Sequence, residues 1–178
     1  MKFLLIVTGS ISAYKAADVA SKLVNKGNEV RVLMTEDAMK FVQPLTFSAI
    51  THQDVLLDKD WFRHDLNGKI FHIHDVENAD KVVLCPATAN TIAKFAHGIA
   101  DNLASSSLLA ALGMNKPIYV FPAMNSNMLT AKTTKKNLSE LAKFENVKIC
   151  ETGFGNLACG AVGKGKLLEV NKIIEIIS

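Results

Sequence analysis

Short apolar runs alternate with amphipathic segments along most of this chain. The apolar run at residues 3–7 predicts a buried strand, and apolar positions spaced three and four apart over residues 13–24 predict a helix. Ser12 is a plausible N-cap for that helix, and Gly27 is a plausible stop. Residues 30–34 predict a second strand. A strand, a helix and a second strand in this order predict a parallel pair.

The same alternation continues to the end of the chain. Because strands and helices alternate throughout, we expect an α/β fold with a doubly wound, Rossmann-like (flavodoxin-like) parallel sheet in a three-layer αβα sandwich. Residues 1–178 should form a single domain. The pattern lapses between residues 53 and 69, where a polar stretch around Trp61 predicts a surface loop of roughly 15 residues. The further elements expected are strands at 81–85, 117–121 and 147–150, a largely helical stretch at 88–112 and a helix at 170–177.

Composition adds an expectation about assembly. The hydrophobic fraction is 49% and the mean hydropathy is +0.19, both high for a soluble domain. Such values suit a sheet that is covered on both faces, or a surface that is buried between subunits. We therefore expect subunit contacts.

Charge and cysteine content narrow the classes of partner. The net charge of +3 is too small to indicate nucleic-acid binding, although an anionic small ligand would suit it. The cysteines Cys85, Cys150 and Cys159 are odd in number and far apart, which favours a reducing cytoplasm over a disulfide framework. The first apolar run is too short to span a membrane. We expect neither a nucleic-acid partner nor a membrane partner.

Polar residues follow every predicted strand on the edge where such sheets bind ligands. Gly9, Ser10 and Ser12 stand at a helix N-terminus, which can hold a phosphate, and Thr35 follows the second strand. Ser12 and Thr35, like Thr88 farther along, could equally be ordinary helix caps. Ile11 and Tyr14 stand where a dinucleotide fingerprint has glycines, so a mononucleotide-like phosphate is preferred over NAD.

His72 and His74 lie just before the third strand, and an extended conformation there would point both imidazoles to one side. Metal ligands can be arranged in this way, but no third ligand is spaced nearby, so we expect no metal and favour a single acid/base histidine. Cys159 lies in a glycine-dense loop, where a reactive thiol is one reading and a small buried hydrophobe the other.

Together these motifs resemble the flavin-dependent cysteine decarboxylases. The resemblance runs from Lys2 to about Leu168, with the motifs in the family's order. It is carried by residues 9–15, 72–73, 86–91, 122–125 with Met128, and 158–160.

The resemblance implies an FMN cofactor and a reaction. The implied substrate is 4'-phospho-N-pantothenoylcysteine, which would be decarboxylated to 4'-phosphopantetheine in coenzyme A biosynthesis. The residues implied to contact FMN are Gly9, Ser10, Ile11, Thr35, Thr88, Ala89, Asn90, Thr91 and Ala123.

The resemblance also implies roles for residues around the substrate. His72 matches an active-site histidine, and Asn125 matches the residue that binds the substrate carboxylate. Asn156 and Ala158 fall in a substrate flap at about residues 151–167. Cys159 matches the thiol that completes the reaction.

The implied chemistry explains these residue types. A carboxylate next to an amide nitrogen leaves poorly until the thiol-bearing carbon is oxidised to a thioaldehyde, which can accept the electron pair, and FMN can accept the hydride. His72 would assist as a base or orienting group, and Asn125 would hold the carboxylate by neutral hydrogen bonds. After carbon dioxide has left, reduced FMN would return the hydride and Cys159 would donate the proton, and the two together convert the enethiol to a saturated thiol.

The resemblance further implies a homo-oligomer, either a trimer or a dodecamer of trimers, with the flavin near a subunit interface. Because the chain ends at Ser178, we expect a separate synthetase for the preceding ligation step. Three alternatives stay open: a peptidyl-cysteine decarboxylase that stops at the enethiol, a flavin prenyltransferase, and a non-catalytic flavin-binding regulatory subunit. Cys159 argues against the first, and the set His72, Asn125 and Cys159 argues against the other two.

Overall fold

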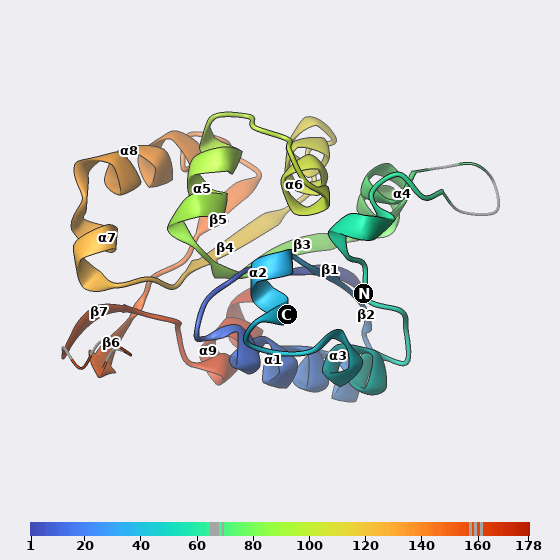
Figure 1. The fold of residues 1–178 in the computed structure, drawn as a ribbon, viewed down its shortest axis with the longest axis horizontal. Coiled ribbons are helices and arrows are strands. Elements are labelled where there is room, and N and C mark those ends of the chain that lie inside the picture. Colours follow the sequence, from blue (N-terminus) through green and yellow to red (C-terminus); the bar gives the residue numbers. More distant parts are fainter. Residues whose placement is uncertain (65–67, 69, 157, 159, 161) are drawn as a thin grey trace.

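The computed structural model describes residues 1–64, 68, 70–156, 158, 160 and 162–178. Its centre is a five-stranded sheet of order β2-β1-β3-β4-β5, in which all neighbouring strands run parallel (Figure 1). The order confirms the expected doubly wound, flavodoxin-like sheet. The strands are β1 (Lys2–Val7), β2 (Glu29–Met34), β3 (Lys81–Ala87), β4 (Ile118–Pro122) and β5 (Val147–Ile149).

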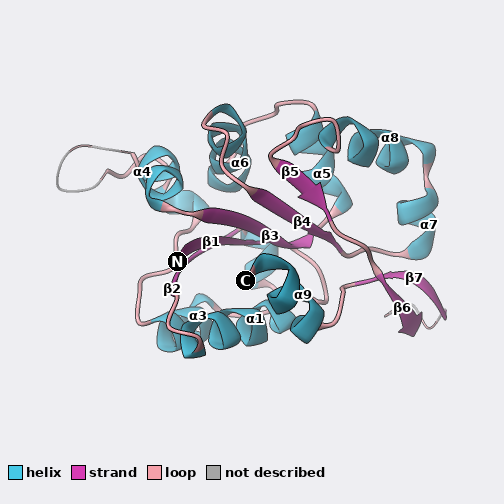
Figure 2. Ribbon diagram, turned by 180° about the vertical axis from the view of Figure 1, so that it is seen from behind, coloured by secondary structure: helices cyan, strands magenta, loops and turns pink. Residues whose placement is uncertain are grey.

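Helices cover both faces of this sheet and give the three layers (Figures 1 and 2). Successive residues of a strand point to opposite faces, so Phe3 and Leu5 enter one core cluster and Leu4 enters the other. Helices α1 (Ala13–Asn25), α3 (Pro44–Thr51) and α9 (Val170–Ile177) cover the first face. Helices α4 (Phe71–Asn78), α5 (Ala89–Ala96), α6 (Leu103–Gly113) and α8 (Lys132–Leu141) cover the second.

Shorter elements lie around the carboxyl ends of the strands and at the sheet edge. They are α2 (Glu36–Met39), the 3-10 helix η1 (Asp58–Asp60) and α7 (Ser126–Thr130). Outside the central sheet, β6 (Gly153–Asn156) and β7 (Val162–Lys166) form an antiparallel hairpin at the left of Figure 1. Within the described part of the chain, no helix is both long enough and apolar enough to cross a membrane.

The stretch between residues 53 and 69 is more ordered than a surface loop. Leu56 bridges to Leu33 on β2, is 3% exposed and exchanges backbone hydrogen bonds with that strand. Asp60 is 4% exposed and accepts a hydrogen bond from the backbone N–H of Leu57 at 3.0 Å. The prediction of a surface loop is therefore wrong for residues 56–60, because Leu56 pairs with β2 and Asp58 accepts a hydrogen bond from the backbone N–H of Leu103.

His72 and His74 do not lie in an extended segment, the geometry in which both imidazoles would point to one side. Both residues lie in the helix α4. Positions two apart on an α-helix point about 200° apart around its axis, so the two imidazoles do not share one side. Val76 of α4 is buried against the sheet, which explains why the segment is helical.

Candidate functional site

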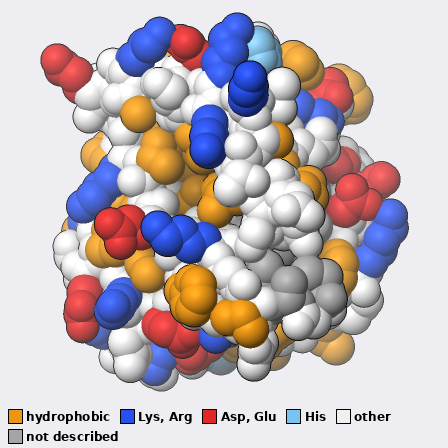
Figure 3. Space-filling view, turned by 90° about the vertical axis from the view of Figure 1, so that its left-hand side faces the viewer, with side chains coloured by type: hydrophobic (Ala, Val, Ile, Leu, Met, Phe, Trp, Pro, Cys, Tyr) orange, Lys and Arg blue, Asp and Glu red, His pale blue; other side chains and the backbone are white. Residues whose placement is uncertain are grey.

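A cavity of about 810 Å³ opens at the carboxyl ends of β1 to β4. Its volume falls within the range of about 300–1,000 Å³ that is typical of small-molecule sites. The strand order reverses between β1 and β3, so the cavity lies where ligands bind in doubly wound sheets. Figure 3 shows this end of the molecule, whose surface mixes hydrophobic, basic and acidic side chains.

Thr8 joins the ends of β1 and β3 beneath the cavity. Its hydroxyl donates to the carbonyl of Pro86 at 2.6 Å and accepts from the backbone N–H of Thr88 at 3.1 Å. Thr8 is 1% exposed, so water does not compete for these hydrogen bonds. This pairing holds the segment after β1 against the segment after β3.

The N-terminus of α1 forms one wall. Ser12 is its N-cap, as predicted, but its hydroxyl accepts no capping hydrogen bond from the described part of the chain. Gly9, Ser10 and Ile11 line the cavity together with Ser12. A Cβ atom at Gly9 would overlap the side chain of Asp37, so only glycine lets the chain pass this closely. A helix N-terminus lined by hydroxyls suits a phosphate group.

Thr35 and Thr88 cap helices and also line the cavity. Thr35 Oγ1 accepts from the backbone N–H of Ala38 at 3.3 Å at the start of α2. Thr88 Oγ1 accepts from the backbone N–H of Thr91 at 3.3 Å at the start of α5. Each threonine therefore caps a helix and also forms part of the cavity wall, so the two roles considered from the sequence are compatible. Ala89, Asn90 and Thr91, in the first turn of α5, also line the cavity.

The segment after β4 contributes a further wall. Ala123 is 3% exposed, and its backbone N–H donates to the carbonyl of Ala87 at 3.0 Å. Asn125 is the N-cap of α7, and its Oδ1 accepts from the backbone N–H of Asn127 at 2.8 Å. That hydrogen bond fixes the orientation of the amide, whose NH₂ group is the kind of donor that a carboxylate requires. Ala123, Asn125 and Met128 all line the cavity.

The β6–β7 hairpin borders one side of the cavity and contacts residues 124–126, which are called the Asn125 segment below. The carbonyl of Gly165 accepts from the backbone N–H of Met124 at 2.9 Å, and Ser126 Oγ donates to the carbonyl of Lys164 at 2.5 Å. A Cβ atom at Gly165 would overlap the carbonyl of Met124, and one at Gly163 would lie 2.6 Å from Ser126 Oγ. The hairpin and the Asn125 segment thus pack without space for an additional methyl group.

The predicted flap coincides with this hairpin. Asn156 and Ala158 line the cavity, as expected for flap residues that face a ligand. Cys159, predicted to complete the reaction, lies outside the described residues.

His72 is not brought into the cavity of its own chain. It lies in the first turn of α4, at the right of Figure 1, whereas the hairpin and α7 lie at the left. Burial lowers the pKa of its imidazole from the ordinary value of 6.5, which favours the neutral form. Its Nδ1 atom is buried and has no hydrogen-bond partner among the described residues.

Charged side chains also line the cavity. Lys15 follows the predicted phosphate-binding segment directly, and Lys166 lies in the predicted flap, where the sequence leaves open either a contact with the substrate phosphate or a solvated loop face. Asp58 gave no such signal, since it is placed by a hydrogen bond from the backbone N–H of Leu103 at 3.0 Å. Burial raises the pKa of the Asp58 carboxyl. The others are Glu36, Asp37 and Lys94.

The described part of the chain contains no group of side chains suited to bind a metal ion. No group of three or more His, Cys, Asp or Glu side chains is placed there to hold a metal ion.

Comparison with known proteins identifies related sequences over nearly the whole chain. The family described as Flavoprotein matches residues 1–178. The bifunctional coenzyme A biosynthesis protein CoaBC of Bacillus subtilis is 42% identical over 97% of this chain, which spans only 41% of that protein. A probable phosphopantothenoylcysteine decarboxylase of Streptococcus mutans is 41% identical over 99% of this chain and 96% of its own length.

Solved structures share the fold at lower identity. A cysteine-to-serine variant of a PPC decarboxylase, in complex with pantothenoylaminoethenethiol, has a TM-score of 0.87 at 28% identity and covers 99% of this chain and 95% of its own. The FMN-dependent cysteine decarboxylase SpaF has a TM-score of 0.82 at 29% identity, with 99% and 94% covered. From the match over residues 1–178 and the relatives above 40% identity, the chain belongs to the Flavoprotein family.

Proposed function

We propose that this chain binds FMN in the cavity at its strand ends and decarboxylates 4'-phospho-N-pantothenoylcysteine to 4'-phosphopantetheine. The observation that carries the proposal is that one cavity gathers the residues expected to hold a flavin, the carboxylate-binding Asn125, and the hairpin residues Asn156 and Ala158. The names of the relatives at 41–42% identity support this substrate. A reducing cytoplasm is the compartment that we expect for it.

The walls of the cavity suit FMN. The backbone N–H groups at the start of α1, with the hydroxyls of Ser10 and Ser12, can hold a phosphate, and Gly9 leaves room for its close approach. Ala123, Ala89 and Thr88 present small side chains at the ends of β3 and β4, where a flat ring can lie. Bound FMN supplies a two-electron acceptor for the carbon that bears the substrate thiol.

The protein side chains position the substrate. The Asn125 amide would donate to the substrate carboxylate, and a neutral donor holds that group without stabilising its charge as strongly as a cation would. The hairpin contacts Met124 and Ser126 beside this position and would shield the bound substrate from water. After carbon dioxide has left, Cys159 would donate the proton that accompanies return of the hydride from the bound flavin, so that the enethiol becomes a saturated thiol.

His72 is proposed to act in the cavity of a neighbouring subunit. A homo-oligomer, as a trimer or a dodecamer of trimers, would allow this, because His72 lies outside the cavity of its own chain. Large apolar side chains beside α4 support a subunit contact there: Phe62 is 82% exposed, stacks on Trp61 with ring centroids 5.0 Å apart, and lies close in sequence to Ile70, which is 42% exposed. His72 would then accept the proton of the substrate thiol.

A comparison of substrates tests this proposal against its alternatives. The flavin-loaded protein should release carbon dioxide from 4'-phospho-N-pantothenoylcysteine and far less from a peptide that ends in cysteine. Release from the peptide alone would instead identify a peptidyl-cysteine decarboxylase. Flavin binding with neither activity would favour a regulatory subunit, and prenylation of the flavin would favour a prenyltransferase. Asn125→Asp, which places a negative charge beside the substrate carboxylate, should reduce release by about 100-fold or more.

A further inference from the structure

The helix α4, which carries His72, depends on tertiary contacts for its position. It has eight residues, and its N-cap, Ile70, makes no side-chain capping hydrogen bond with the described part of the chain. All eight residues are described, and Val76 alone among them is fully buried. A helix of this length is marginal by itself. The side chains that contact α4 from other elements therefore decide where His72 lies.

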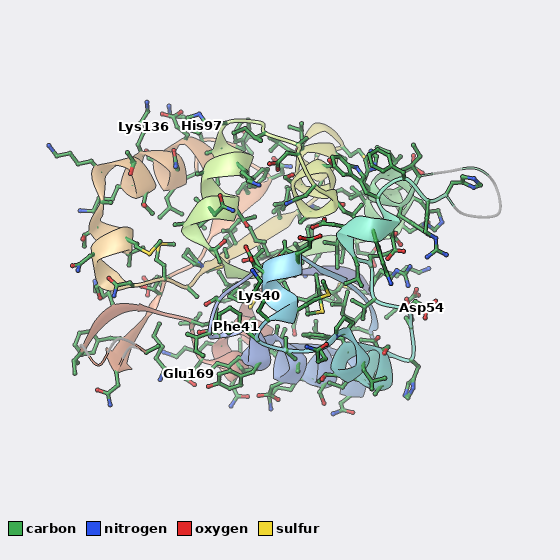
Figure 4. All side chains as sticks on the ribbon, in the orientation of Figure 1. Lys40, Phe41, Asp54, His97, Lys136 and Glu169 are labelled. Carbon is green, nitrogen blue, oxygen red and sulfur yellow. The ribbon has the colours of Figure 1, made fainter. Side chains whose placement is uncertain are left out.

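One such contact comes from Arg31 on β2, the strand at one end of the sheet order. Its Nε atom lies 3.5 Å from Asp75 Oδ1, and its guanidinium carbon lies 6.0 Å from the centre of the Phe71 ring. Its Nη1 atom donates to the backbone carbonyl of Asp54 at 2.5 Å, and Figure 4 labels Asp54 on the segment that follows α3. Arg31 therefore joins α4 to β2 and to that segment.

The two residues of α4 that Arg31 contacts lie on one face of the helix. Phe71 and Asp75 are four residues apart, so their side chains are neighbours on the helix surface. His72 lies about 100° further round the axis, on the same face as the buried Val76. Val76 holds that face against the sheet, whereas Arg31 holds the adjacent face against β2. Together the two contacts fix the rotation of α4 about its axis, and hence the direction of His72.

The ion pair between Arg31 and Asp75 is partly withdrawn from water. The side chain of Asp75 is 11% exposed and that of Arg31 is 22% exposed. Charges in such a place interact more strongly than a surface pair, and removal of one partner leaves the other in an unfavourable environment. His74 Nδ1 lies 3.7 Å from the same carboxylate oxygen, but an imidazole is charged only when it is protonated. Arg31 is charged at every pH at which an enzyme works, so it is the constant partner of Asp75.

We propose that Arg31 is a positioning residue that sets the rotation at which α4 presents His72 to the cavity of the neighbouring subunit. It acts through Asp75 and Phe71, and it is not among the described residues that line the cavity. The inference rests on the proposed function, in which His72 accepts the proton of the substrate thiol. Proton transfer requires the two heavy atoms to lie within about 2.6–3.2 Å, so a small rotation of α4 moves the imidazole out of reach.

The first measurement separates kcat from KM. Arg31→Met keeps an apolar side chain and removes the contacts with Asp75 and Asp54. It should lower kcat by about 30-fold or more, because a misplaced base slows proton transfer. KM should change by less than about three-fold, because other elements build the cavity that binds the substrate. Lys143→Met is the matched control, since Lys143 also pairs with a carboxylate, Glu140 at 2.6 Å, but lies outside the cavity lining.

The second measurement is subunit exchange, which would not rescue a variant whose own cavity is damaged. In a hetero-oligomer of Arg31→Met and Asn125→Asp, some cavities combine an intact Asn125 with a His72 that is held by an intact Arg31. After exchange of equal amounts, activity should rise to about a quarter of that of the unaltered protein, as expected for His72→Asn mixed with Asn125→Asp. If Arg31→Met does not fold, the double variant Arg31→Met/Asp75→Asn, which leaves no unpaired carboxylate, is used in the same mixture.

Each other outcome overturns the inference in a recognisable way. An unchanged kcat in Arg31→Met, or a loss confined to KM, would refute it. If the His72→Asn mixture recovers activity and the Arg31→Met mixture does not, Arg31 acts within its own subunit and this inference alone is refuted. If neither mixture recovers although exchange is demonstrated, the inference fails together with the role of His72 across the interface. If the unaltered protein does not decarboxylate the substrate at all, the proposed function fails and this inference with it.

Discussion

Individual residues determine how closely the chain approaches a ligand at the strand ends. Gly9 passes so near Asp37 that a single methyl group has no room. Thr8, buried under the same segment, bonds to both Pro86 and Thr88 and fixes the spacing of two strand ends. The proposed cradle for the flavin phosphate therefore depends on side chains that need not touch the flavin.

Gly9→Ala tests this dependence. The added Cβ would displace Asp37 and the start of α2, so we expect a loss of about 1–3 kcal/mol in the free energy of unfolding and weaker FMN retention. Urea unfolding and flavin absorbance measure the two effects. Gly113→Ala is the control, because no described atom beyond its own helical turn and chain neighbours lies within 4 Å of the Cβ position there. Equal behaviour of the two variants would mean that Gly9 is not confined.

The pH dependence of kcat/KM tests the state of His72. Burial lowers its pKa below 6.5, so the neutral imidazole, which can accept a proton, persists as the pH falls through that value. The acid limb of kcat/KM should therefore lie below pH 6.5. Because the substrate phosphate also titrates near pH 6, the profile should be repeated with pantothenoylcysteine. An acid limb above pH 6.5 with both substrates would contradict the assignment.

Among the elements, the β6–β7 hairpin and the Asn125 segment are packed as one unit. Two backbone carbonyls of β7 accept hydrogen bonds from Met124 and Ser126. The glycines of β7 allow this contact, since Gly163 and Gly165 face atoms that a side chain would strike. Any opening of the hairpin must break these hydrogen bonds and thus frees the segment that carries Asn125.

A double-mutant cycle between Gly163→Ala and Ser126→Ala tests this packing. Alone, Gly163→Ala places a Cβ atom 2.6 Å from Ser126 Oγ, whereas in the Ser126→Ala background the nearest of these atoms is the Cβ at 3.6 Å, an ordinary contact. Gly163→Ala should therefore lower the free energy of local opening by less in that background, with a difference of about 0.5–3 kcal/mol. Hydrogen exchange of the Met124 amide measures this free energy of opening. An equal decrease in both backgrounds would show that the two residues are not in contact.

The helix α4 shows why local pattern misled the prediction for one element. Phe71-His72-Ile73-His74 alternates apolar and polar residues, but four residues are too few to separate a period of 2 from a period of 3.6. The burial of Val76 and the contact of α4 with α6 decide the conformation, and neither can be read from those four residues. The strands of the central sheet were predicted well, and β1 and β3 show why, because their apolar runs are buried on both faces. The strands β6 and β7 were not predicted, because they are short, glycine-rich and largely exposed.

In the whole molecule, the topology assembles the cavity from segments that are distant in sequence. The walls predicted from the strand ends, such as Gly9, Thr35, Thr88 and Asn125, do meet, because parallel strands all finish at one edge. Asp58 could not be predicted, since hydrogen bonds from the backbone of segments distant in sequence, such as Leu103, place it at this edge. The place of His72 could not be predicted either, because it depends on how α4 packs, and on any neighbouring subunit.

Mixing two inactive variants tests whether His72 completes a neighbour's cavity. His72→Asn retains Asn125, and Asn125→Asp retains His72, so a hetero-oligomer can contain sites with both residues intact. Random assortment of equal amounts, after subunit exchange, should restore about a quarter of the activity. Each variant alone should remain inactive. If the mixture also stays inactive although exchange is demonstrated, His72 does not act across a subunit interface.

The identity of the product tests the central claim most directly. Purified, FMN-loaded protein should be incubated with 4'-phospho-N-pantothenoylcysteine. The products should then be separated and their masses determined by mass spectrometry. The account predicts 4'-phosphopantetheine as a saturated thiol from the unaltered protein, and an enethiol from Cys159→Ser. Recovery of unchanged substrate with FMN bound, or of an enethiol from the unaltered protein, would contradict it.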